Sequence, residues 1–581
     1  MRAVSPNRRN LPLHLLLGAL VLAAGALEAW FGRTELFGDD ISYLDVANLI
    51  RSGDWRAALN PLWSIGYPLL LSCVRPLFPS TIHGELIAVF VLNLLIYLAS
   101  WISFRWLLRT AAAFLGARMS VDPPSANQPL SPFLLMAAAC VFVSAQVGIG
   151  RVSSIGPDQL VACLFFLASA LVLRFTLRPN PRDGALLGLT LGLGFIAKAV
   201  FLPLSVILLA TALLPRRRLR PAIALSAPAA LLLLLLPYAA ALSWAIGRPT
   251  FGESGPLNYA FHVNQLPHWM GWQGGPPRLG NPLHPVHLLR DHPAVFAFGE
   301  PFHVTYPPQF NLFFWYDGYR HFFSPANAIR AILDNLHALE TVLHENAAFA
   351  LAWWVCIGIL ISLQPDRFNF RRDRRNWFRP LGPLWPLFVP SLLGIALYVQ
   401  VHLEGRYIAA FLAVSALVPF VAEDCSVTRV TPRARIVLLA VLASGTLLSL
   451  YPTLRTPVRL VFHRSDPLSG PQWTIARYLT QSGLQPGDRV AAVTTLNDIR
   501  CTWAYAAHLH IVAAIGNDAY SPENQQVDFN LFWSDPATQQ DVLRLFRSQG
   551  AVAVIVPRTA APPSSPGWQP IPNTDAWFLP L

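Results

Sequence analysis

Charged side chains are scarce in this chain. Only 13% of its 581 residues are Asp, Glu, Lys or Arg, and 54% are hydrophobic, whereas a soluble globular protein carries about 25% charged residues. Several apolar runs reach the roughly 20 residues that a helix needs to cross a bilayer. The composition therefore excludes an ordinary soluble protein and predicts a mainly α-helical, polytopic membrane protein with about eleven transmembrane helices.

Cysteine pairs and nucleotide-binding motifs are also lacking. The six cysteines are scattered and none forms a C-x-x-C pair, so the sequence predicts neither a zinc knuckle nor a disulfide framework. No G-x-G-x-x-G or phosphate-loop motif occurs, so no nucleotide site is implied. No internal repeat occurs either, which argues against a transporter built from two repeated halves.

Lysine is nearly absent, and the net charge of +12 comes from arginine. The arginines cluster in short loops between the apolar runs, on one side of the predicted membrane domain, as the positive-inside rule expects. Nucleic-acid binding is therefore not needed to explain the basic composition. The arginines of the N-terminus precede an apolar run at 11–30, which predicts a retained first helix that starts inside rather than a cleaved signal peptide.

The predicted membrane domain spans 1–465 and is interrupted by two outer loops, 31–83 and 247–345. The first loop holds two short amphipathic segments that we expect to lie on the membrane surface. From about residue 466 the composition becomes that of a soluble protein, and alternating strand and helix patterns predict an α/β domain over 466–581. The helix count places this domain outside the cell membrane. The arginine-rich composition favours a bacterial inner membrane.

One apolar stretch, 184–214, is too long for one upright helix and too short for two. It contains Lys198, the only lysine of the chain. We expect two short helices that meet near Lys198. A charge inside an apolar run costs roughly 2.5–3.5 kcal/mol on insertion scales. Lys198 is therefore expected either to pair with an acid on another helix or to hold an external anion such as a lipid phosphate.

Three acids lie at the predicted outer surface. Asp39 and Asp40 follow the first helix, and Asp158 opens a later one. A carboxylate at a low-dielectric boundary can have its pKa raised and can then take a proton from an attacking hydroxyl. One of the first pair could also hold a metal or orient the base. The alternative for all three is capping of a helix N-terminus or compensation of its dipole.

The outer junction of two later helices carries Glu404, Arg406 and Tyr407. Arginine suits bidentate phosphate binding, and tyrosine adds a hydroxyl donor. Anchoring at the membrane interface explains the arginine and the tyrosine equally well.

The second outer loop is rich in histidine and aromatic residues. His284 and His287 have a spacing that suits metal ligands, but no cysteine or acid stands at ligand spacing beside them. The aromatic stretch 306–317 either stacks on a sugar or packs at the membrane interface.

These segments together resemble the GT-C superfamily of membrane glycosyltransferases, which includes the protein O-mannosyltransferases and the aminoarabinose transferase of lipid A. The resemblance covers about residues 11–422. It rests on the order and common outer placement of short segments at 38–60 with 63–68, 156–158, 188–198 and 404–407.

The resemblance implies an enzyme that moves a sugar from a polyprenyl-phosphate donor to an acceptor on the outer face of the membrane, in one inverting displacement. Lys198 and Arg406, with Tyr407, would hold the lipid phosphate leaving group, and Glu404 would support them. The acceptor would be a lipid, a glycan or a protein.

For the base, the resemblance implies an outer-loop aspartate, here Asp39 or Asp40. Members of the superfamily that use a divalent metal ion bind it with acids from two outer loops, which would here be Asp39 or Asp40 with Asp158. Members without a metal also exist, so the metal requirement is left open. The sequence has Asp-Asp where the mannosyltransferases have Asp-Glu, which leaves the division of roles between the two acids open.

Two other classes compete with the enzyme. A lipid or glycan transporter or flippase would use Lys198 and the acids to line a pathway, although the acids lie on one face rather than at the bilayer midplane. A non-catalytic anchor for the C-terminal domain would not need polar residues at matching depth on several helices.

Overall fold

The computed structural model describes most of the chain, and the described residues form two compact units. Unit 1 comprises Met1–Gly32, Val89–Ala241 and Ala328–Arg459, and unit 2 comprises Arg33–Ala88, Leu242–Asn327 and Leu460–Leu581. The arginine-rich segments 216–218 and 367–379 lie outside the described residues. The described residues are 11–119, 130–215, 219–268, 271–363, 382–425, 430–463, 468–494, 501–515, 529–557 and 566–581.

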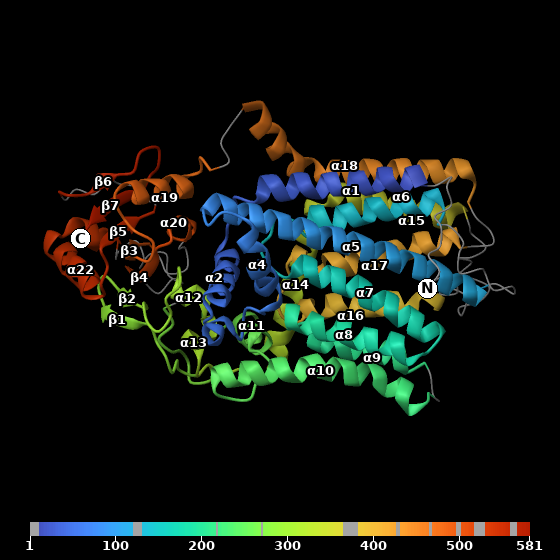
Figure 1. The fold of residues 1–581 in the computed structure, drawn as a ribbon, viewed down its shortest axis with the longest axis horizontal. Helices are drawn as coiled ribbons and strands as arrows, with labels where there is room; N and C mark the ends of the chain where they lie inside the picture. Colours follow the sequence, from blue (N-terminus) through green and yellow to red (C-terminus); the bar gives the residue numbers. More distant parts are fainter. Residues whose placement is uncertain are drawn as a thin grey trace. The chain divides into compact units, whose positions relative to one another are not determined.

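Unit 1 is a bundle of α-helices (Figure 1). Some of these helices continue beyond the unit at one end. The helices of the bundle are α1 (Leu11–Gly32), α5 (Ile82–Met119), α6 (Pro132–Val143) with the π-helical turn η2 (Ser144–Ile149), α7 (Asp158–Leu177), α8 (Pro181–Ala197), α9 (Phe201–Leu213), α10 (Pro221–Ile246), α14 (Pro325–Glu345), α15 (Ala347–Leu363), the 3-10 turn η4 (Gly382–Leu384) with α16 (Trp385–Val399), α17 (Gly405–Asp424) and α18 (Pro432–His463).

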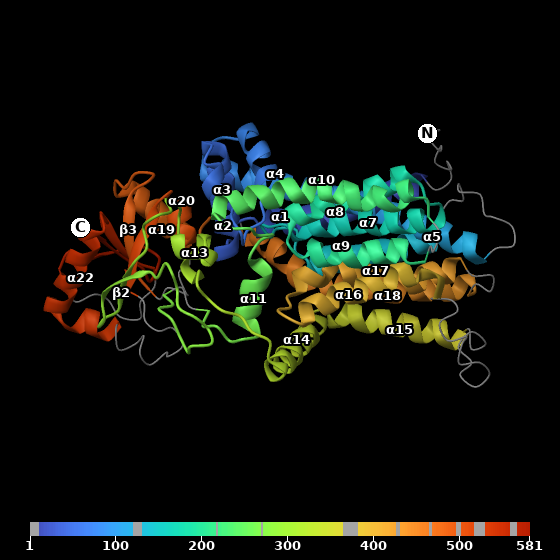
Figure 2. The same ribbon diagram turned by 90° about the horizontal axis from the view of Figure 1, so that it is seen from below.

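Eight helices of the described chain are long and apolar enough to cross a bilayer, or nine if the bent pair α14 and α15 counts as one span. The two members of this pair meet at 88° (Figure 2). The predicted count of about eleven also included the stretch 184–214 as two short helices. The structure has α8 and α9 there, with 17 and 13 residues, and they meet at Lys198 as expected. The fold is therefore the predicted polytopic helical bundle.

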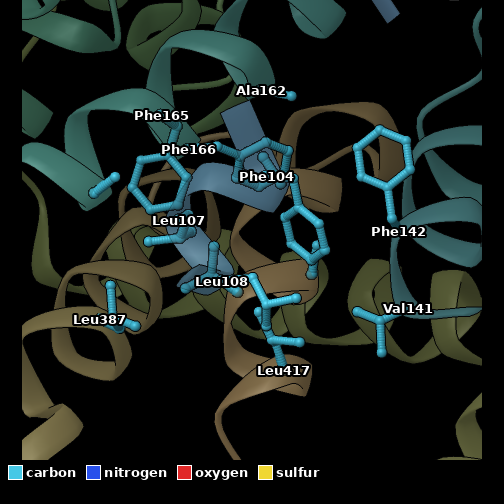
Figure 3. Close-up of a cluster of buried hydrophobic side chains, with 14 of the residues drawn as sticks. Phe104, Leu107, Leu108, Val141, Phe142, Ala162, Phe165, Phe166, Leu387 and Leu417 are labelled. Carbon is cyan, nitrogen blue, oxygen red and sulfur yellow. The ribbon is translucent and has the colours of Figure 1, made fainter. Parts of the chain in front are cut away.

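Aromatic side chains fill the centre of unit 1 (Figure 3). Phe104 of α5 packs against Phe142 of α6 and Phe166 of α7, with ring centroids 5.3 and 4.9 Å apart. Phe165 meets Phe411 of α17 at 4.6 Å. The helix α7, whose first residue is Asp158, therefore packs against α5, α6 and α17.

Unit 2 gathers three separate segments of the chain. Its helical elements include α2 (Gly38–Ser52), α3 (Trp55–Ala58), α4 (Gly66–Val74) with the 3-10 turn η1 (Arg75–Leu77), α11 (Ser254–His262), α12 (Pro307–Phe310), α13 (Leu312–Tyr316), α19 (Pro471–Gln481), α20 (Thr502–Ala506) and α22 (Pro536–Ser548). The amphipathic segments predicted in the first outer loop correspond to α2 to α4. The helix α2 ends at Gly53, whose φ of 84° is the left-handed conformation that favours glycine.

A seven-stranded sheet lies in unit 2, with the order β1-β2-β4-β3-β5-β7-β6. Its centre, β4-β3-β5, is parallel, and the outer strands pair antiparallel. The buried side chains Val542 and Phe546 of α22 pack against this sheet. The strands are β1 (His287–Arg290), β2 (Val295–Ala297), β3 (Arg489–Val493), β4 (His510–Ile515), β5 (Ala553–Val556), β6 (Gln569–Pro570) and β7 (Trp577–Pro580).

The sequence predicted β3, β5, α19 and the C-terminal part of α22, but it missed β4 and all four outer strands. Two of these, β1 and β2, come from the loop 247–345, and β2 pairs with β4 in register from Val295↔Ile515 to Ala297↔Ala513. The sheet therefore extends beyond the predicted domain of 466–581. The compact unit that contains it also includes most of the predicted outer loop 31–83 and the part of the second loop up to Asn327, whereas 328–345 belongs to unit 1.

Candidate functional site

Lys198 lies in unit 1, in the break between α8 and α9, where its backbone is extended (φ −158°, ψ 134°). Its Nζ atom is 2.5 Å from Oδ1 of Asp158, the first residue of α7. The lysine side chain is 21% exposed and the aspartate side chain 8%. Of the two roles expected for Lys198, the structure therefore has the ion pair with an acid on another helix. Asp158 is part of a charge cluster as well as of the first turn of α7.

Arg406 joins this cluster from the start of α17. Its Nε atom is 2.7 Å from Oε2 of Glu404 and 3.8 Å from Oδ2 of Asp158. His402 contacts the other oxygen of Glu404 at 3.2 Å. Burial works to raise the pKa of Glu404, but the hydrogen bond from His402 and the charge of Arg406 outweigh it and bring the pKa to about 2. Glu404 is therefore ionised at neutral pH and holds Arg406.

Two tyrosines form one wall of the cluster. Lys198 Nζ lies 3.7 Å from the ring centroid of Tyr407, a cation–π arrangement. The ring of Tyr407 stacks on that of Tyr398 from α16, with centroids 5.2 Å apart. The Tyr407 hydroxyl is 3.4 Å from Nη2 of Arg406. The Tyr398 hydroxyl is buried, and among the described residues it has no hydrogen-bond partner.

Buried amides lie beside Asp158. The Gln159 amide donates to the backbone oxygen of Gln146 at 2.9 Å, while Oε1 of Gln159 and Nε2 of Gln146 find no partner in the part of the chain that the structure describes. Gln146 belongs to the π-helical turn η2, and such turns occur frequently at functional sites. Unpaired buried polar atoms are costly, so this end of the bundle has donors and an acceptor suited to a ligand or to water.

Buried polar residues also fix the turns that carry the cluster. Asn335 of α14 donates to the backbone oxygen of Val399 (3.1 Å) and accepts the N–H of Leu403 (2.9 Å), so it holds the turn before Glu404. Glu28 of α1 accepts the backbone N–H and the hydroxyl of Ser153, at 2.8 and 2.6 Å, in the turn before α7.

Six of these residues were not predicted from the sequence: Tyr398, His402, Asn335, Glu28, Gln146 and Gln159. A signal existed only for Glu28, because an acid inside an apolar run is expected to have a structural or functional partner.

The acids of the first outer loop lie in unit 2. Asp40 is buried, and its Oδ2 accepts the N–H of Phe37 at 2.9 Å, so it caps α2, one of the two roles expected for this pair. Asp39 is half-buried, and its Oδ1 accepts from the amide of Gln309 at 3.1 Å. Gln309 belongs to the aromatic stretch 306–317, which thus packs on the start of α2. Asp39 is the more accessible of the two.

A third acid of α2, Asp45, was not expected from the sequence. It is 6% exposed and accepts the N–H and the hydroxyl of Thr305, at 3.1 and 2.9 Å. Burial raises the pKa of Asp45 to about 7, although the two hydrogen bonds from Thr305 work against this. Nearby, burial and then the charge of Asp45 raise the pKa of Cys501 to about 12.

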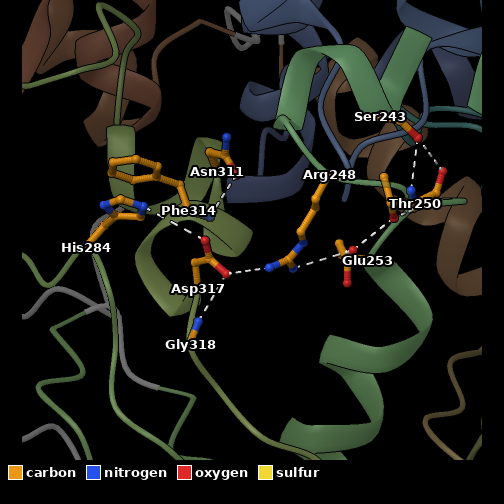
Figure 4. A network of polar contacts seen from close by, with 10 residues as sticks. Ser243, Arg248, Thr250, Glu253, His284, Asn311, Phe314, Asp317 and Gly318 are labelled. Atoms are coloured by element: carbon orange, nitrogen blue, oxygen red, sulfur yellow. Dashed lines mark hydrogen bonds and ion pairs between the residues drawn. The ribbon is translucent and has the colours of Figure 1, made fainter. Parts of the chain in front are cut away.

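One histidine of the second outer loop, His284, belongs to a polar network (Figure 4). Asp317 meets Arg248 at 3.0 Å and His284 at 3.9 Å, and Arg248 also meets Glu253 at 3.6 Å. The His284 ring stacks on Phe314 with centroids 4.2 Å apart. Across the described residues, no group of three or more His, Cys, Asp or Glu side chains could hold a metal ion.

Comparisons with known proteins give a fold but no sequence family. No protein-family model matches the chain, and no curated protein matches it. The structure of ArnT from Cupriavidus metallidurans bound to undecaprenyl phosphate superimposes with a TM-score of 0.52 at 13% identity, over 98% of this chain and 97% of that one. The chain has the GT-C fold.

A second comparison is with an archaeal protein. The oligosaccharyltransferase of Archaeoglobus fulgidus, in complex with Zn and sulfate, matches with a TM-score of 0.46 at 12% identity, over 93% of this chain and 67% of that one. Four predicted site residues, Asp158, Lys198, Arg406 and Tyr407, form one cluster with Glu404 in unit 1. Asp39 and Asp40 belong to unit 2.

Proposed function

We propose that this protein is a membrane glycosyltransferase that moves a sugar from a polyprenyl-phosphate donor to an acceptor hydroxyl on the outer face of the cell membrane. The observation that carries the proposal is the cluster around Lys198 and Arg406, in a fold shared with a protein whose structure contains undecaprenyl phosphate. A bacterial inner membrane, with unit 2 outside, is part of the proposal.

The cluster supports a role in holding the donor phosphate. Lys198 and Arg406 supply two positive charges, and Asp158 and Glu404 balance them while no ligand is bound. An incoming phosphate would compete for the same N–H groups, and charge-assisted hydrogen bonds of this kind are stronger than neutral ones. The buried hydroxyl of Tyr398 is a further donor for a phosphate oxygen. Tyr407 would keep Lys198 in position through its ring.

Asp39 is the acid that we assign as base. Its carboxylate would take the proton of the acceptor hydroxyl while the hydroxyl oxygen bonds to the anomeric carbon. The bond from that carbon to the lipid phosphate oxygen breaks, its electron pair stays on the phosphate, and the configuration at carbon inverts. Asp40 is less suited, because its carboxylate caps α2. No step is derived through a metal ion, and the acceptor is a lipid, a glycan or a protein.

The test of the base uses the purified chain in detergent with radiolabelled polyprenyl-phosphate sugars, membrane extract as acceptor source, and divalent metal. We expect the wild type to release sugar from the lipid. Asp39→Asn should lower the rate by about 10²–10⁴, the usual contribution of a general base. The control Glu35→Gln, at an exposed acid of the same loop, should match the wild type. Full activity of Asp39→Asn would remove Asp39 from the role.

Binding of the donor phosphate by Tyr398 is tested separately. Tyr398→Phe removes only a hydroxyl that has no partner among the described residues, so the melting temperature should not fall, whereas KM for the donor should rise several-fold. Tyr97→Phe is the matched control, because the buried Tyr97 hydroxyl donates to the backbone oxygen of Val21 at 3.0 Å. Its loss should cost about 1 kcal/mol of stability and leave the donor KM unchanged. An unchanged KM in Tyr398→Phe would contradict the assignment.

Movement of labelled lipid across a liposome membrane without formation of a glycosidic bond would favour the transporter class instead.

A further inference from the structure

The helix α14 has three faces that differ in character. Residues three and four positions apart lie on one face of a helix. The inner face packs on unit 1: Ala331 and Asn335 are buried, and Val342 lies against the hydrophobic core. A second face is polar and mostly exposed, with Arg330, Asp334, His337, Thr341 and His344. The third, which we call the outer apolar face, comprises Ile329, Leu333, Leu336 and Leu343.

The outer apolar face lacks the cover that its composition calls for. Its four side chains are 40–60% exposed, and exposed apolar patches mark surfaces that bind protein or membrane. One acid, Glu340, stands in the same row, but its carboxylate contacts His337 of the polar face at 3.3 Å. A helix with one apolar and one polar outer face has the pattern of helices that lie in the plane of a membrane surface.

The next helix sets the direction of α14. The helix α15 follows after one residue, its 17 residues include no charged side chain, and this length is within the range of membrane-crossing helices. Its side chains Leu351 and Trp354 are 65% and 64% exposed, as expected for a surface that faces lipid. Because α14 meets α15 at 88° (Figure 2), α14 runs along the membrane surface when α15 crosses it. A single broken span made of both helices would instead take Arg330 and Asp334 into the hydrocarbon, where charges are costly.

Contacts of the inner face place α14 at the end of the bundle that carries the charge cluster. The Asn335 side chain bonds to both ends of the turn 399–403, directly before the cluster. A Cβ added at Gly405 would lie 3.4 Å from the side chain of Val342. The helix α14 therefore lies at the same membrane face as the charge cluster, which is the outer face in the predicted topology.

We propose that α14 docks on the outer leaflet of the membrane, with its outer apolar face among the upper acyl chains and its polar face in water. The attraction is apolar, because Asp334, Glu340 and Glu345 outnumber Arg330 on this helix and anionic head groups would not be drawn to it. Asn335 belongs to the same helix, so the membrane surface and the charge cluster would share one support. The docking does not depend on glycosyl transfer.

The test is photo-crosslinking of the full-length chain in phosphatidylcholine liposomes, with p-benzoylphenylalanine at one position at a time. At Leu336 and Ile329, on the outer apolar face, we expect lipid adducts in mass spectra, with a yield close to that at Leu351 of α15. The matched control is Asp334, which is 72% exposed and lies on the polar face; its yield should be several-fold lower. Addition of phosphatidylglycerol should leave the four yields unchanged. All four positions are exposed, so the melting temperatures should match that of the wild type.

Four results would overturn the proposal. Crosslinks from positions 329 and 336 to protein instead of lipid would mean that a partner or a second copy covers this face. Lipid adducts at 351 but at neither 329 nor 336 would place α14 above the membrane. Equal yields at 334 and 336 would mean that no face of α14 is preferred, and a yield that rises with phosphatidylglycerol would indicate attraction through the head groups.

Discussion

At the scale of single residues, Lys198 and Asp45 illustrate opposite solutions to the burial of a charge. Lys198 keeps a partner, Asp158, at 2.5 Å and an aromatic ring at 3.7 Å. Among the residues that the structure describes, Asp45 has only uncharged donors, both from Thr305. A charge that lacks an opposite charge in a buried place shifts its pKa towards the neutral form. The ionisation of Asp45 in unit 2 therefore affects folding near neutral pH.

The raised pKa of Asp45 predicts that the stability of the protein depends on pH. The pKa of Asp45 is about 7 in the folded chain and about 3.9 in an unfolded one. The folded state binds the proton of Asp45 more tightly than the unfolded state does. The stabilisation by protonated Asp45 is therefore complete below about pH 4 and is lost as pH rises to about 7. Each increase of one pH unit in this range lowers the free energy of unfolding by at most about 1.4 kcal/mol. The melting temperature of the wild type should therefore fall from pH 5 to pH 8.

Asp45→Asn is the variant that isolates this effect. Its amide can accept from and donate to Thr305 without a charge, so it should melt above the wild type at pH 8 and close to it at pH 5. Glu35→Gln, at an exposed acid, should follow the wild-type profile. Parallel pH profiles for the wild type and Asp45→Asn would show that Asp45 does not titrate in this range.

At the scale of elements, α8 packs against α10 through a row of glycines. An added Cβ at Gly184 would meet Ser226, one at Gly188 the backbone of Ala227, and one at Gly192 the side chain of Leu234. Glycines four residues apart lie on one face of a helix and let two membrane helices approach closely. The close approach fixes α8, whose C-terminus carries Lys198. The glycines of 188–198 thus have a packing role in addition to their place in the family resemblance.

The glycine row can be tested by substitution. Gly188→Ala would place a methyl group against the carbonyl oxygen of Ala227, which belongs to a backbone and cannot move aside. We expect a loss of about 1–3 kcal/mol, as for other overpacked sites, seen as a lower melting temperature in detergent. Gly358→Ala in α15 is the control, since nothing lies within 4 Å of its added Cβ. Equal melting temperatures for the two variants would contradict this packing.

At the scale of the whole molecule, the chain alternates between its two units. Each unit takes three separate segments of sequence, and α5 and α10 pass from one unit to the other. The predicted topology assigns unit 2 to the outside and the arginine-rich loops to the inside. Two cysteines are suited to test it: Cys73 is exposed, and Cys425 is partly exposed at the end of α17.

Single-cysteine variants can report this orientation. With a membrane-impermeant maleimide on bacterial spheroplasts, we expect labelling of Cys73 and not of Cys425, and labelling of both after permeabilisation. Cys356, which is buried, should react only after unfolding. The reverse pattern, with Cys425 labelled in intact spheroplasts, would invert the topology and place Asp39 inside.

The sequence by itself determined the membrane class, most of the spanning helices, the break at Lys198 and several residues of the charge cluster. These follow from local properties: apolar run length, the distribution of arginine, and the cost of one lysine in an apolar segment. Only the tertiary structure decided that Asp158 pairs with Lys198, that Asp40 caps α2, and that β1 and β2 join the C-terminal sheet. It also brought Tyr398 and Asn335 to the site. Most of these contacts join residues dozens to hundreds of positions apart, and no local pattern encodes such pairs. The cap at Asp40 is local and was one of two roles expected for this acid, and the start of α2 at Gly38 decided between them.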